Sequence, residues 1–281
     1  MGSCFPKQLE RRKAISTERK ALRDLHQSVG EDFPACAYRP PDRKNWMAGI
    51  NPKKPFGQCQ TMSIYKQLVT GTRVLDIRVQ KDRRVCHGIL ITYHIDVVIK
   101  DIKKFLSETK SEIILLEIRT EYGHQDPPDF DKYLVDQLGE TISELLPKRI
   151  ICVWKPRNSP SPEAGAPLWN SVYLNDDWID TDLPSTKFEN NLKCLSEQPP
   201  ISSRKFLYRV ENTVTPQADN PIVCVRPVTQ RIHEFARLFI TECFCRGIAD
   251  RLQIFSTDFI DEDFVDACVA VTYSRIDHGK A

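Results

Sequence analysis

Apolar and polar positions alternate along this chain in blocks that predict helices and strands in turn. Apolar side chains recur at helical spacing in residues 62–71, 97–106, 130–146 and 232–243. Short apolar runs that predict strands occupy residues 74–79, 112–120, 149–154, 206–210 and 252–255. Near-continuous apolar strands that alternate with helices are typical of a parallel sheet covered on both faces. The pattern predicts one α/β domain, and we expect it to be a barrel.

Two parts of the chain lack this periodicity. Residues 156–167 contain four prolines and predict a loop, and residues 168–205, rich in Asp, Asn, Pro and Trp, are expected to be mostly irregular. At the other end, residues 7–25 carry seven basic side chains against three acidic ones. We therefore divide the chain into a basic N-terminal arm, residues 1–40, and a barrel domain, residues 41–281.

The first residues of the arm leave two interpretations open. Gly2 is placed for N-myristoylation and Cys4 for palmitoylation, but Pro6 occupies the position where Ser or Thr is preferred. One lipid followed by a basic segment gives stable membrane association. The alternative is a solvated, partly helical arm without a membrane role.

Composition narrows the class of protein. The 281 residues suffice for an α/β barrel, which needs about 250. A net charge of +2 does not favour a nucleic-acid partner, and no apolar stretch approaches the roughly 20 residues that span a bilayer. The ten cysteines include no C-x-x-C pair. We interpret them as reduced thiols, which predicts an intracellular, cytoplasmic protein, and we expect a monomer.

Charged residues follow the apolar runs where the predicted strands end. These residues are Asp76, Arg78, Glu117, Arg119, Glu121, Lys155, Arg209, Glu211 and Asp258. Charges at one strand end are explained by contact with water alone. Repetition over five strands, with both signs present, favours a polar funnel at one rim of the barrel, because catalytic groups of α/β barrels lie at the carboxyl ends of the strands.

The strand at residues 74–79 carries the chemistry that is easiest to interpret. It presents Asp76 and Arg78, and His87 follows a short charged turn. An arginine binds phosphoryl oxygens, and an imidazole donates or accepts a proton near neutral pH. The three residues therefore favour a reaction at a phosphate, although His87 could instead be a structural histidine beside the turn at Gly88.

These motifs carry a family resemblance. The chain resembles the X region of phosphatidylinositol-specific phospholipases C in residues 67–78, in His87-Gly88 and in residues 105–117. From about Asn45 to its C-terminus it is similar to plant-type phospholipase C-like phosphodiesterases, single-domain relatives of the bacterial enzymes. The resemblance implies a distorted, incompletely closed TIM barrel and a phosphodiesterase acting on phosphatidylinositol or a related phosphodiester in lipid metabolism or signalling.

The resemblance also assigns catalytic roles. In this family an inositol hydroxyl attacks phosphorus while one histidine accepts its proton and a second protonates the leaving oxygen. His87 matches the second histidine, the general acid, and Arg78 matches the arginine that contacts the phosphate. Asp76 lies on the same strand face, where it can orient either of them. Asp258 matches the acid that pairs with the first histidine.

Three further residues are expected to bind substrate. Arg119 matches a basic substrate contact of the bacterial enzymes, Lys155 lies on the next strand, and we place Glu117 with them. The calcium-dependent members of the family have a carboxylate where this chain has Arg78. A cation at that position repels a metal and supplies its charge, so we expect no calcium, no other metal and no cofactor.

The chain departs from the family at the first histidine. The expected Gly-Thr-His-Asp motif should follow a segment that contains tryptophan, but residues 47–58 after Trp46 contain no histidine. We therefore expect the general base and the first barrel strand to be missing, and a second contraction near residues 139–141. Alternative splicing, an error in the sequence and a true pseudoenzyme each fit these gaps. His94 or His124 could substitute for the base, but nothing in the sequence places either one opposite His87.

Three interpretations remain from the sequence. The first is an impaired phosphoric diester hydrolase, because loss of one member of an acid–base pair typically costs a factor of 10² to 10⁴ in rate. The second is a non-catalytic protein that binds inositol phosphates or phospholipids. The third is a destabilised barrel without function, because removal of a strand exposes two sheet edges.

Overall fold

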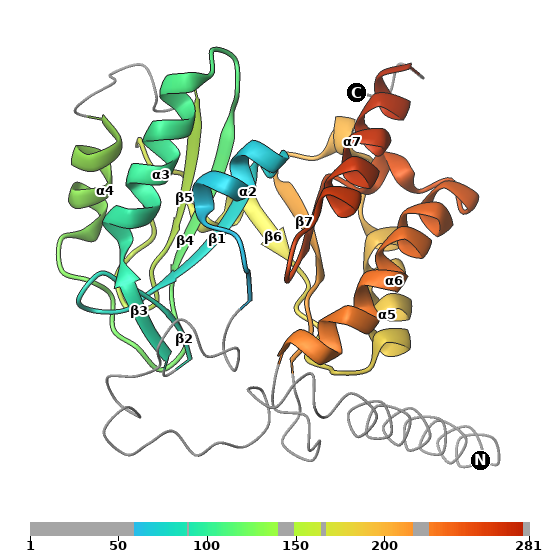
Figure 1. Cartoon of the computed structure of the whole chain (residues 1–281), viewed down its shortest axis with the longest axis horizontal. Coiled ribbons are helices and arrows are strands. Elements are labelled where there is room, and N and C mark those ends of the chain that lie inside the picture. Colours follow the sequence, from blue (N-terminus) through green and yellow to red (C-terminus); the bar gives the residue numbers. More distant parts are fainter. Residues whose placement is uncertain (1–58, 89, 140–148, 164–166, 216–224, 278–281) are drawn as a thin grey trace.

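The computed structural model describes residues 59–88, 90–139, 149–163, 167–215 and 225–277 (Figure 1). The predicted basic arm, with Gly2 and Cys4, lies outside these residues. So do residues 140–148, which contain most of the predicted contraction and the end of the predicted helix 130–146.

The first half of the described chain forms a five-stranded sheet in the order β3-β2-β1-β4-β5. Its strands are β1 (Val74–Val79), β2 (Arg84–His87), β3 (Leu90–His94), β4 (Ile114–Thr120) and β5 (Ile150–Lys155). β1, β4 and β5 are parallel, with Asp76 in register with Glu117 and Arg78 with Arg119. β2 and β3 are antiparallel and extend the sheet from β1. The register brings the predicted site residues of β1 and β4 side by side.

The second half forms a smaller parallel sheet in the order β6-β7-β8. Its strands are β6 (Leu174–Asp176), β7 (Leu207–Asn212) and β8 (Ile254–Thr257). One bridge, between Val153 and Trp169, continues the hydrogen bonding from β5 toward β6. In the described part of the chain, no strand pairs with both β1 and β8. The described strands therefore form an incomplete barrel in which the two sheets do not close on each other at β1 and β8.

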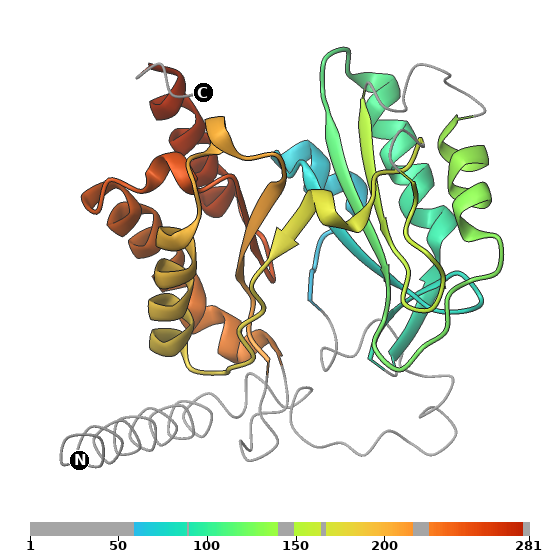
Figure 2. The ribbon, with the colours of Figure 1, turned by 180° about the vertical axis from the view of Figure 1, so that it is seen from behind.

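Helices cover the outer faces of both sheets (Figures 1 and 2). α2 (Ile64–Thr70), α3 (Ile95–Glu108) and α4 (Phe130–Gly139) accompany the first sheet. α5 (Pro184–Glu197), α6 (Val225–Cys245) and α7 (Glu262–Asp277) accompany the second. Short 3-10 helices occupy Ser171–Tyr173, Ile201–Ser203 and Ala249–Arg251. No helix among the described residues is long and apolar enough to cross a membrane.

Among the described residues, the core has one large apolar cluster on each sheet and a small one between them. The small cluster contains Leu115 of β4, Val153 of β5, Leu174 of β6 and Ile254 of β8. These four side chains come from both sheets, so their contact marks the inside of the barrel. The alternation of strand and helix therefore produces the α/β barrel architecture that the sequence predicts, with one side left open.

α2 shows how local sequence fixes the entrance to β1. The Ser63 hydroxyl caps the helix by accepting a hydrogen bond from the Lys66 N–H (3.2 Å). Gly71 ends the helix with φ +120°, and a Cβ atom there would lie 2.6 Å from Val265 Cγ1. A side chain at this position would clash with α7, so glycine is needed both for the turn and for the packing of α2 against α7.

The secondary structure corrects one expectation and adds three elements. Residues 168–205 were expected to be mostly irregular, but they contain β6 and the 14-residue helix α5. Pro184 at the start of α5 is compatible with a first helical turn, and Phe188, Leu192 and Leu195 supply its apolar face. The hairpin β2–β3 and the helix α7 were not predicted. The described cysteines form no disulfide bond with one another.

Candidate active site

The carboxyl ends of β1, β7 and β8 face a cavity of about 930 Å³. Its lining includes Cys59, Asp76, Arg78, His87, Glu121, Arg209, Glu211 and Asp258. The four residues predicted to be catalytic, namely Asp76, Arg78, His87 and Asp258, are thus brought together although 182 positions separate the first from the last. Arg119, Lys155 and Glu117 adjoin this cavity through the ion pairs described next.

Arg209 of β7 lies at the centre of the charged rim. Only 1% of its side chain is exposed, and its guanidinium contacts four carboxylates, three on other strands and one on β7 itself. These carboxylates are Asp76 (3.0 Å), Glu117, Asp176 (2.6 Å) and Glu211. Because the planar guanidinium presents five donors, it bonds several carboxylates at once and links the two sheets.

The predicted substrate-binding residues form the second part of this network. Glu117 is fully buried. It accepts a hydrogen bond from Arg119 Nε (2.9 Å) and forms an ion pair with Lys155 Nζ (3.1 Å). Asp176 of β6 also faces Arg119 (3.2 Å). Arg119 and Lys155 keep 22% and 17% of their side-chain surface exposed, whereas Glu117 has none. Glu117 therefore holds the two cations in place, and contact of any of the three with substrate stays a prediction.

Arg78 is oriented by carboxylates on both sides. Asp76 accepts hydrogen bonds from its Nε (2.7 Å) and Nη2 (3.1 Å), and Glu121 lies 3.5 Å from its Nη1. Removal from water alone would raise the pKa of Asp76, but Arg78 and then Arg209 hold it far below its usual range. Asp76 therefore stays charged and fixes Arg78, which still has 30% of its side chain exposed for an anion.

His87 is exposed at the end of β2, next to a turn that is fixed on two sides. Gly88 has φ +55°, a backbone conformation that favours glycine. Its N–H donates to Glu121 Oε1 (3.2 Å), and its carbonyl lies 2.8 Å from His124 Nε2. His124 thus reaches the rim, where it supports the turn beside His87. His94, by contrast, caps α3 by accepting a hydrogen bond from the Asp96 N–H (3.4 Å).

Cys59 occupies the space between His87 and Asp258. Its Sγ lies 3.5 Å from His87 Nδ1, and its thiol is hydrogen bonded to the Asp258 carboxylate. The backbone here is fixed to the end of β8, because the Phe259 N–H donates to the Cys59 carbonyl (2.7 Å). Gln60 adds two bonds, donating to the Thr257 carbonyl (3.0 Å) and accepting from the Ile260 N–H (2.9 Å). A cysteine therefore lies beside the acid that the resemblance pairs with a histidine.

Unlike Asp76 and Asp176, and like Glu211, Asp258 has a raised pKa. Burial raises its pKa to about 7, although hydrogen bonds from the Cys59 thiol and the Val214 N–H partly oppose this rise. Only 7% of the residue is exposed. The buried ammonium of Lys187 in α5 also lowers the pKa of Asp258. Burial lowers the pKa of Lys187 to about 8. Burial and the nearby Asp258 in turn raise the pKa of the Cys59 thiol. Asp258 thus titrates close to neutral pH.

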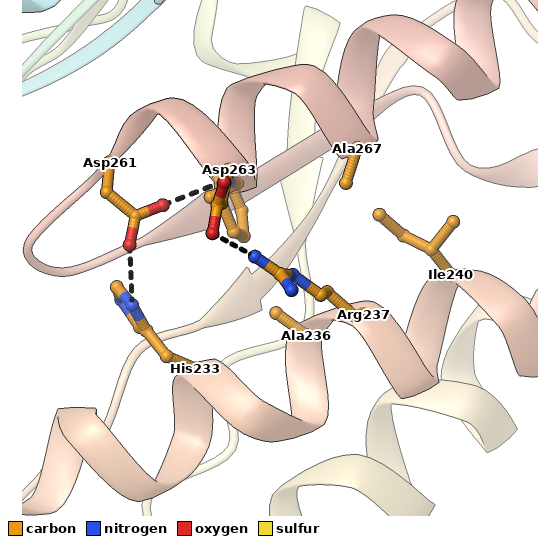
Figure 3. Close-up of a pocket in the computed structure, with 8 residues that line it drawn as sticks. His233, Ala236, Arg237, Ile240, Asp261, Asp263 and Ala267 are labelled. Carbon is orange, nitrogen blue, oxygen red and sulfur yellow. Dashed lines mark hydrogen bonds and ion pairs between the residues drawn. The ribbon is translucent and has the colours of Figure 1, made fainter.

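A second, smaller cavity of about 340 Å³ lies behind Asp258, between α6 and α7 (Figure 3). Figure 3 shows His233 of α6 pointing to Asp261, 3.6 Å from its Nδ1, and Arg237 pointing to Asp263. The other ring nitrogen of His233 lies 2.7 Å from the Asp258 carbonyl. His233 therefore supports the backbone of Asp258 from outside the barrel.

The sequence of this site was compared with known protein families. Residues 50–164 match the family model of the phosphatidylinositol-specific phospholipase C, X domain. This part of the chain is similar to that family. The matched span contains all the predicted site residues except Asp258, which lies in the second sheet.

Two curated proteins show the same relationship. The chain is 35% identical over 78 residues to a 1-phosphatidylinositol phosphodiesterase of Listeria monocytogenes, which covers 27% of this chain and 25% of the relative. It is 25% identical over 243 residues to a PI-PLC X-box domain-containing protein of Dictyostelium discoideum, covering 74% of this chain and 33% of the relative. The chain thus spans a third or less of the length of these phospholipase C relatives.

Solved structures confirm the fold. The phosphatidylinositol-specific phospholipase C of Listeria monocytogenes superposes with a TM-score of 0.62 at 17% identity, covering 78% of this chain and 85% of that one. A variant of the Staphylococcus aureus enzyme gives a TM-score of 0.58 at 15% identity, covering 77% and 86%. The distorted, incompletely closed barrel expected of a phospholipase C-like chain is therefore confirmed.

Three residues of the candidate site were missed in the sequence. Asp176 belongs to a strand of three residues, and Cys59 and Lys187 lie in segments without a chemical motif. Arg209 and Glu211 were noted only as charges at a strand end. Among the described residues, no group of three or more His, Cys, Asp or Glu side chains is arranged to hold a metal ion.

Proposed function

We propose that this chain cleaves a phosphodiester of the phosphatidylinositol type without calcium, more slowly than a site with two histidines. One observation carries the proposal: Arg78, His87 and Asp258 line the same cavity at the carboxyl ends of the barrel strands. A cation for the phosphate and groups that transfer protons on both sides of it are what this reaction needs. The family relationship supports the same reaction class.

In the proposed reaction Arg78 binds the non-bridging phosphoryl oxygens. Asp76 and Glu121 keep its guanidinium in place, so little reorganisation is needed when charge develops on the phosphate. His87, exposed in the cavity, protonates the leaving oxygen. Arg119 and Lys155 carry the remaining exposed cationic surface of the rim, where we place the hydroxyl groups of the substrate.

The test is release of inositol phosphate from phosphatidylinositol vesicles in the presence of a calcium chelator. We expect measurable turnover that falls at least about 100-fold in His87→Ala. His94→Ala is the matched control, because His94 lies at the other end of the same hairpin and caps α3. Arg78→Met and Arg84→Met form a second pair, since Arg84 is an exposed arginine of β2. Equal rates in His87→Ala and His94→Ala would refute the assignment.

A second candidate function is binding of inositol phosphates or phospholipids without turnover. The observation that favours it is Cys59, whose sulfur occupies the place beside Asp258 where the resemblance expects a histidine. Equilibrium binding of a soluble inositol phosphate separates the two functions. A binding protein keeps its affinity in His87→Ala and loses it in Arg78→Met or Arg119→Met, with no product formed by any variant.

We further propose that the basic segment of residues 7–25 holds the protein at an anionic membrane surface inside the cell. Its seven basic side chains each contribute on the order of 1 kcal/mol near such a surface. Sedimentation with vesicles that contain or lack anionic lipid, using the chain with and without residues 1–40, tests this. Equal sedimentation of both forms would refute the proposal.

A further inference from the structure

Among the described residues, Asp258 is the one rim carboxylate whose hydrogen-bond donors are all neutral. The Cys59 thiol and the Val214 N–H donate to it, whereas Asp76, Glu117, Asp176 and Glu211 all contact Arg209. Its carboxylate is almost fully enclosed yet forms part of the wall of the cavity. A carboxylate in this position is available for chemistry that the paired carboxylates cannot perform.

We propose that Asp258 is the general base of this site, working opposite His87 in place of a second histidine. The inference rests on the proposed function and adds the residue that starts the reaction. Its geometric basis is the row Asp258, Cys59 and His87, in which the sulfur contacts a group on either side. A phosphodiester bound by Arg78 in the same cavity would therefore have a proton acceptor and a proton donor on different sides.

The structure holds Asp258 firmly at the rim. Phe259, the next residue, has φ +49° and donates its N–H to the Cys59 carbonyl. A left-handed conformation at a non-glycine residue is strained, and strain of this kind is retained where the surroundings enforce it. The Gln60 side chain bonds the backbone on both sides of Asp258, at Thr257 and Ile260. On the outer side His233 contacts the Asp258 carbonyl.

Titratable groups on each neighbouring element surround Asp258. Cys59, ahead of α2, supplies a neutral thiol, and Glu211 of β7 raises the pKa of Asp258. Lys187 of α5 lowers it, and His233 of α6 faces its backbone with Asp261 beyond. Burial is the largest effect, and the resulting pKa is about 7. A base with this pKa is ionised in half of the molecules at neutral pH and accepts a proton efficiently.

The proposed step is balanced as follows. The Asp258 carboxylate takes the proton of the attacking hydroxyl, whose oxygen forms a new bond to phosphorus. The bond from phosphorus to the leaving oxygen breaks, and that oxygen takes a proton from His87. Asp258 ends protonated and His87 neutral, and exchange with water restores both. No metal and no external oxidant or reductant takes part.

The first test measures kcat/KM against pH in the whole chain and in Asp258→Asn. Asn is isosteric and resembles the protonated carboxyl, so the fold is expected to persist, and circular dichroism checks it. We expect wild-type activity to rise with pH through about 7 and Asp258→Asn to lose at least about 100-fold at pH 8. A loss below about threefold, or an unchanged pH profile, overturns the assignment.

Cys59→His separates failure of this inference from failure of the proposed function. If the wild-type chain is inactive and Cys59→His is active, the site is a phosphodiesterase site without a base, and Asp258 is not the base. If both are inactive and both are folded, the proposed function fails, and the inference fails with it. Wild-type activity that Asp258→Asn abolishes supports both.

Lys187→Met tests whether the surroundings set the pKa of the base. Lys187 donates to the Ile179 carbonyl (2.8 Å) and does not line the cavity. Loss of its charge should move the rising limb of the pH profile to higher pH, because the cation favours the ionised carboxylate. Lys193→Met, an exposed lysine of the same helix, is the control. A limb that stays in place in Lys187→Met shows that it does not report Asp258.

Discussion

The rim of the barrel contains two groups of carboxylates that differ in their surroundings. Around Arg209, Asp76 and its neighbours face guanidinium and ammonium groups, and the pKa of Asp76 and of Asp176 is lowered although burial opposes this. At the end of β8, Asp258 faces a thiol and a backbone N–H, and burial raises its pKa to about 7. Contact with cations therefore lowers the pKa of Asp76 and Asp176, whereas burial without a contacting cation raises the pKa of Asp258.

This difference separates two tasks within one site. Asp76 and Asp176 have lowered pKa values, so they stay charged at neutral pH and are fixed parts of the electrostatic environment that holds cations for a phosphate. Asp258 changes its protonation near neutral pH and can therefore exchange a proton. Environments that push the pKa values of neighbouring groups apart are a general way to assign acid and base roles.

The largest expected effect comes from removing the cation that the first group shares. Arg209→Met leaves Glu117, which is fully buried, and three other carboxylates without their common partner. We expect the free energy of unfolding at pH 7 to fall by about 3–5 kcal/mol, as when one partner of a buried ion pair is removed. Urea denaturation followed by circular dichroism measures it. A fall below about 1 kcal/mol would mean that water already screens the cluster.

The second prediction concerns Asp258, whose replacement should raise the free energy of unfolding instead of lowering it. Because its pKa is higher in the folded chain than in the unfolded one, the wild type is most stable below about pH 4 and loses stability as pH rises to about 7. Asn carries no charge and avoids this loss. Asp258→Asn should therefore be more stable than wild type at pH 8 by up to about 4 kcal/mol, and by much less at pH 4.

Thermal melting of Asp258→Asn and wild type at pH 4, 6 and 8 measures this difference. Asp261→Asn is the control, because Asp261 lies three residues further on and its side chain is 54% exposed. A wild type that is more stable than Asp258→Asn at pH 8 would show that the carboxylate is compensated by charge, like the first group.

The sequence predicted the first group of residues better than the second. Asp76, Arg78, Glu117 and Arg119 follow strongly apolar runs, and the parallel register of β1 and β4 makes neighbours of residues with the same position in each run. Strand ends can thus be aligned without the structure. The barrel fold follows from the same periodicity, and its confirmation by solved structures rests on these strands.

Cys59 and Lys187 could not be found in this way. Cys59 reaches Asp258 through contacts across about two hundred residues, and no periodic element contains it. Lys187 lies on the buried face of α5. The polar composition of this segment does not predict a helix, and lysine is rarely buried. The position of Cys59 depends on how the end of β8 packs against the segment before α2, and that of Lys187 on its hydrogen bond to the Ile179 carbonyl. Both are tertiary contacts.

A third prediction weakens the attachment of the Cys59 segment to β8. Gln60→Ala removes two hydrogen bonds that fix this segment on both sides of Asp258. Two partly buried bonds contribute about 1–2 kcal/mol together, so the free energy of unfolding should fall by that amount. Hydrogen exchange at the Phe259 and Ile260 amides should accelerate as well. Gln60→Glu keeps the acceptor for Ile260 and loses the donor to Thr257, so an intermediate effect is expected.

The smallest expected effect comes from an ion pair that water reaches. Arg246, directly after α6, contacts Glu242 in the last turn of that helix at 2.6 Å, but their side chains are 55% and 37% exposed. Exposed pairs of this spacing contribute about 0.3–0.5 kcal/mol, because water and salt screen the charges. Arg246→Met should therefore change the free energy of unfolding by less than about 0.5 kcal/mol, and 0.5 M salt should remove the change. Arg209→Met makes the same chemical substitution, so the pair measures how burial alone changes the effect of losing a guanidinium. Equal losses in the two variants would contradict the buried role assigned to Arg209 and the contrast between its carboxylates and Asp258.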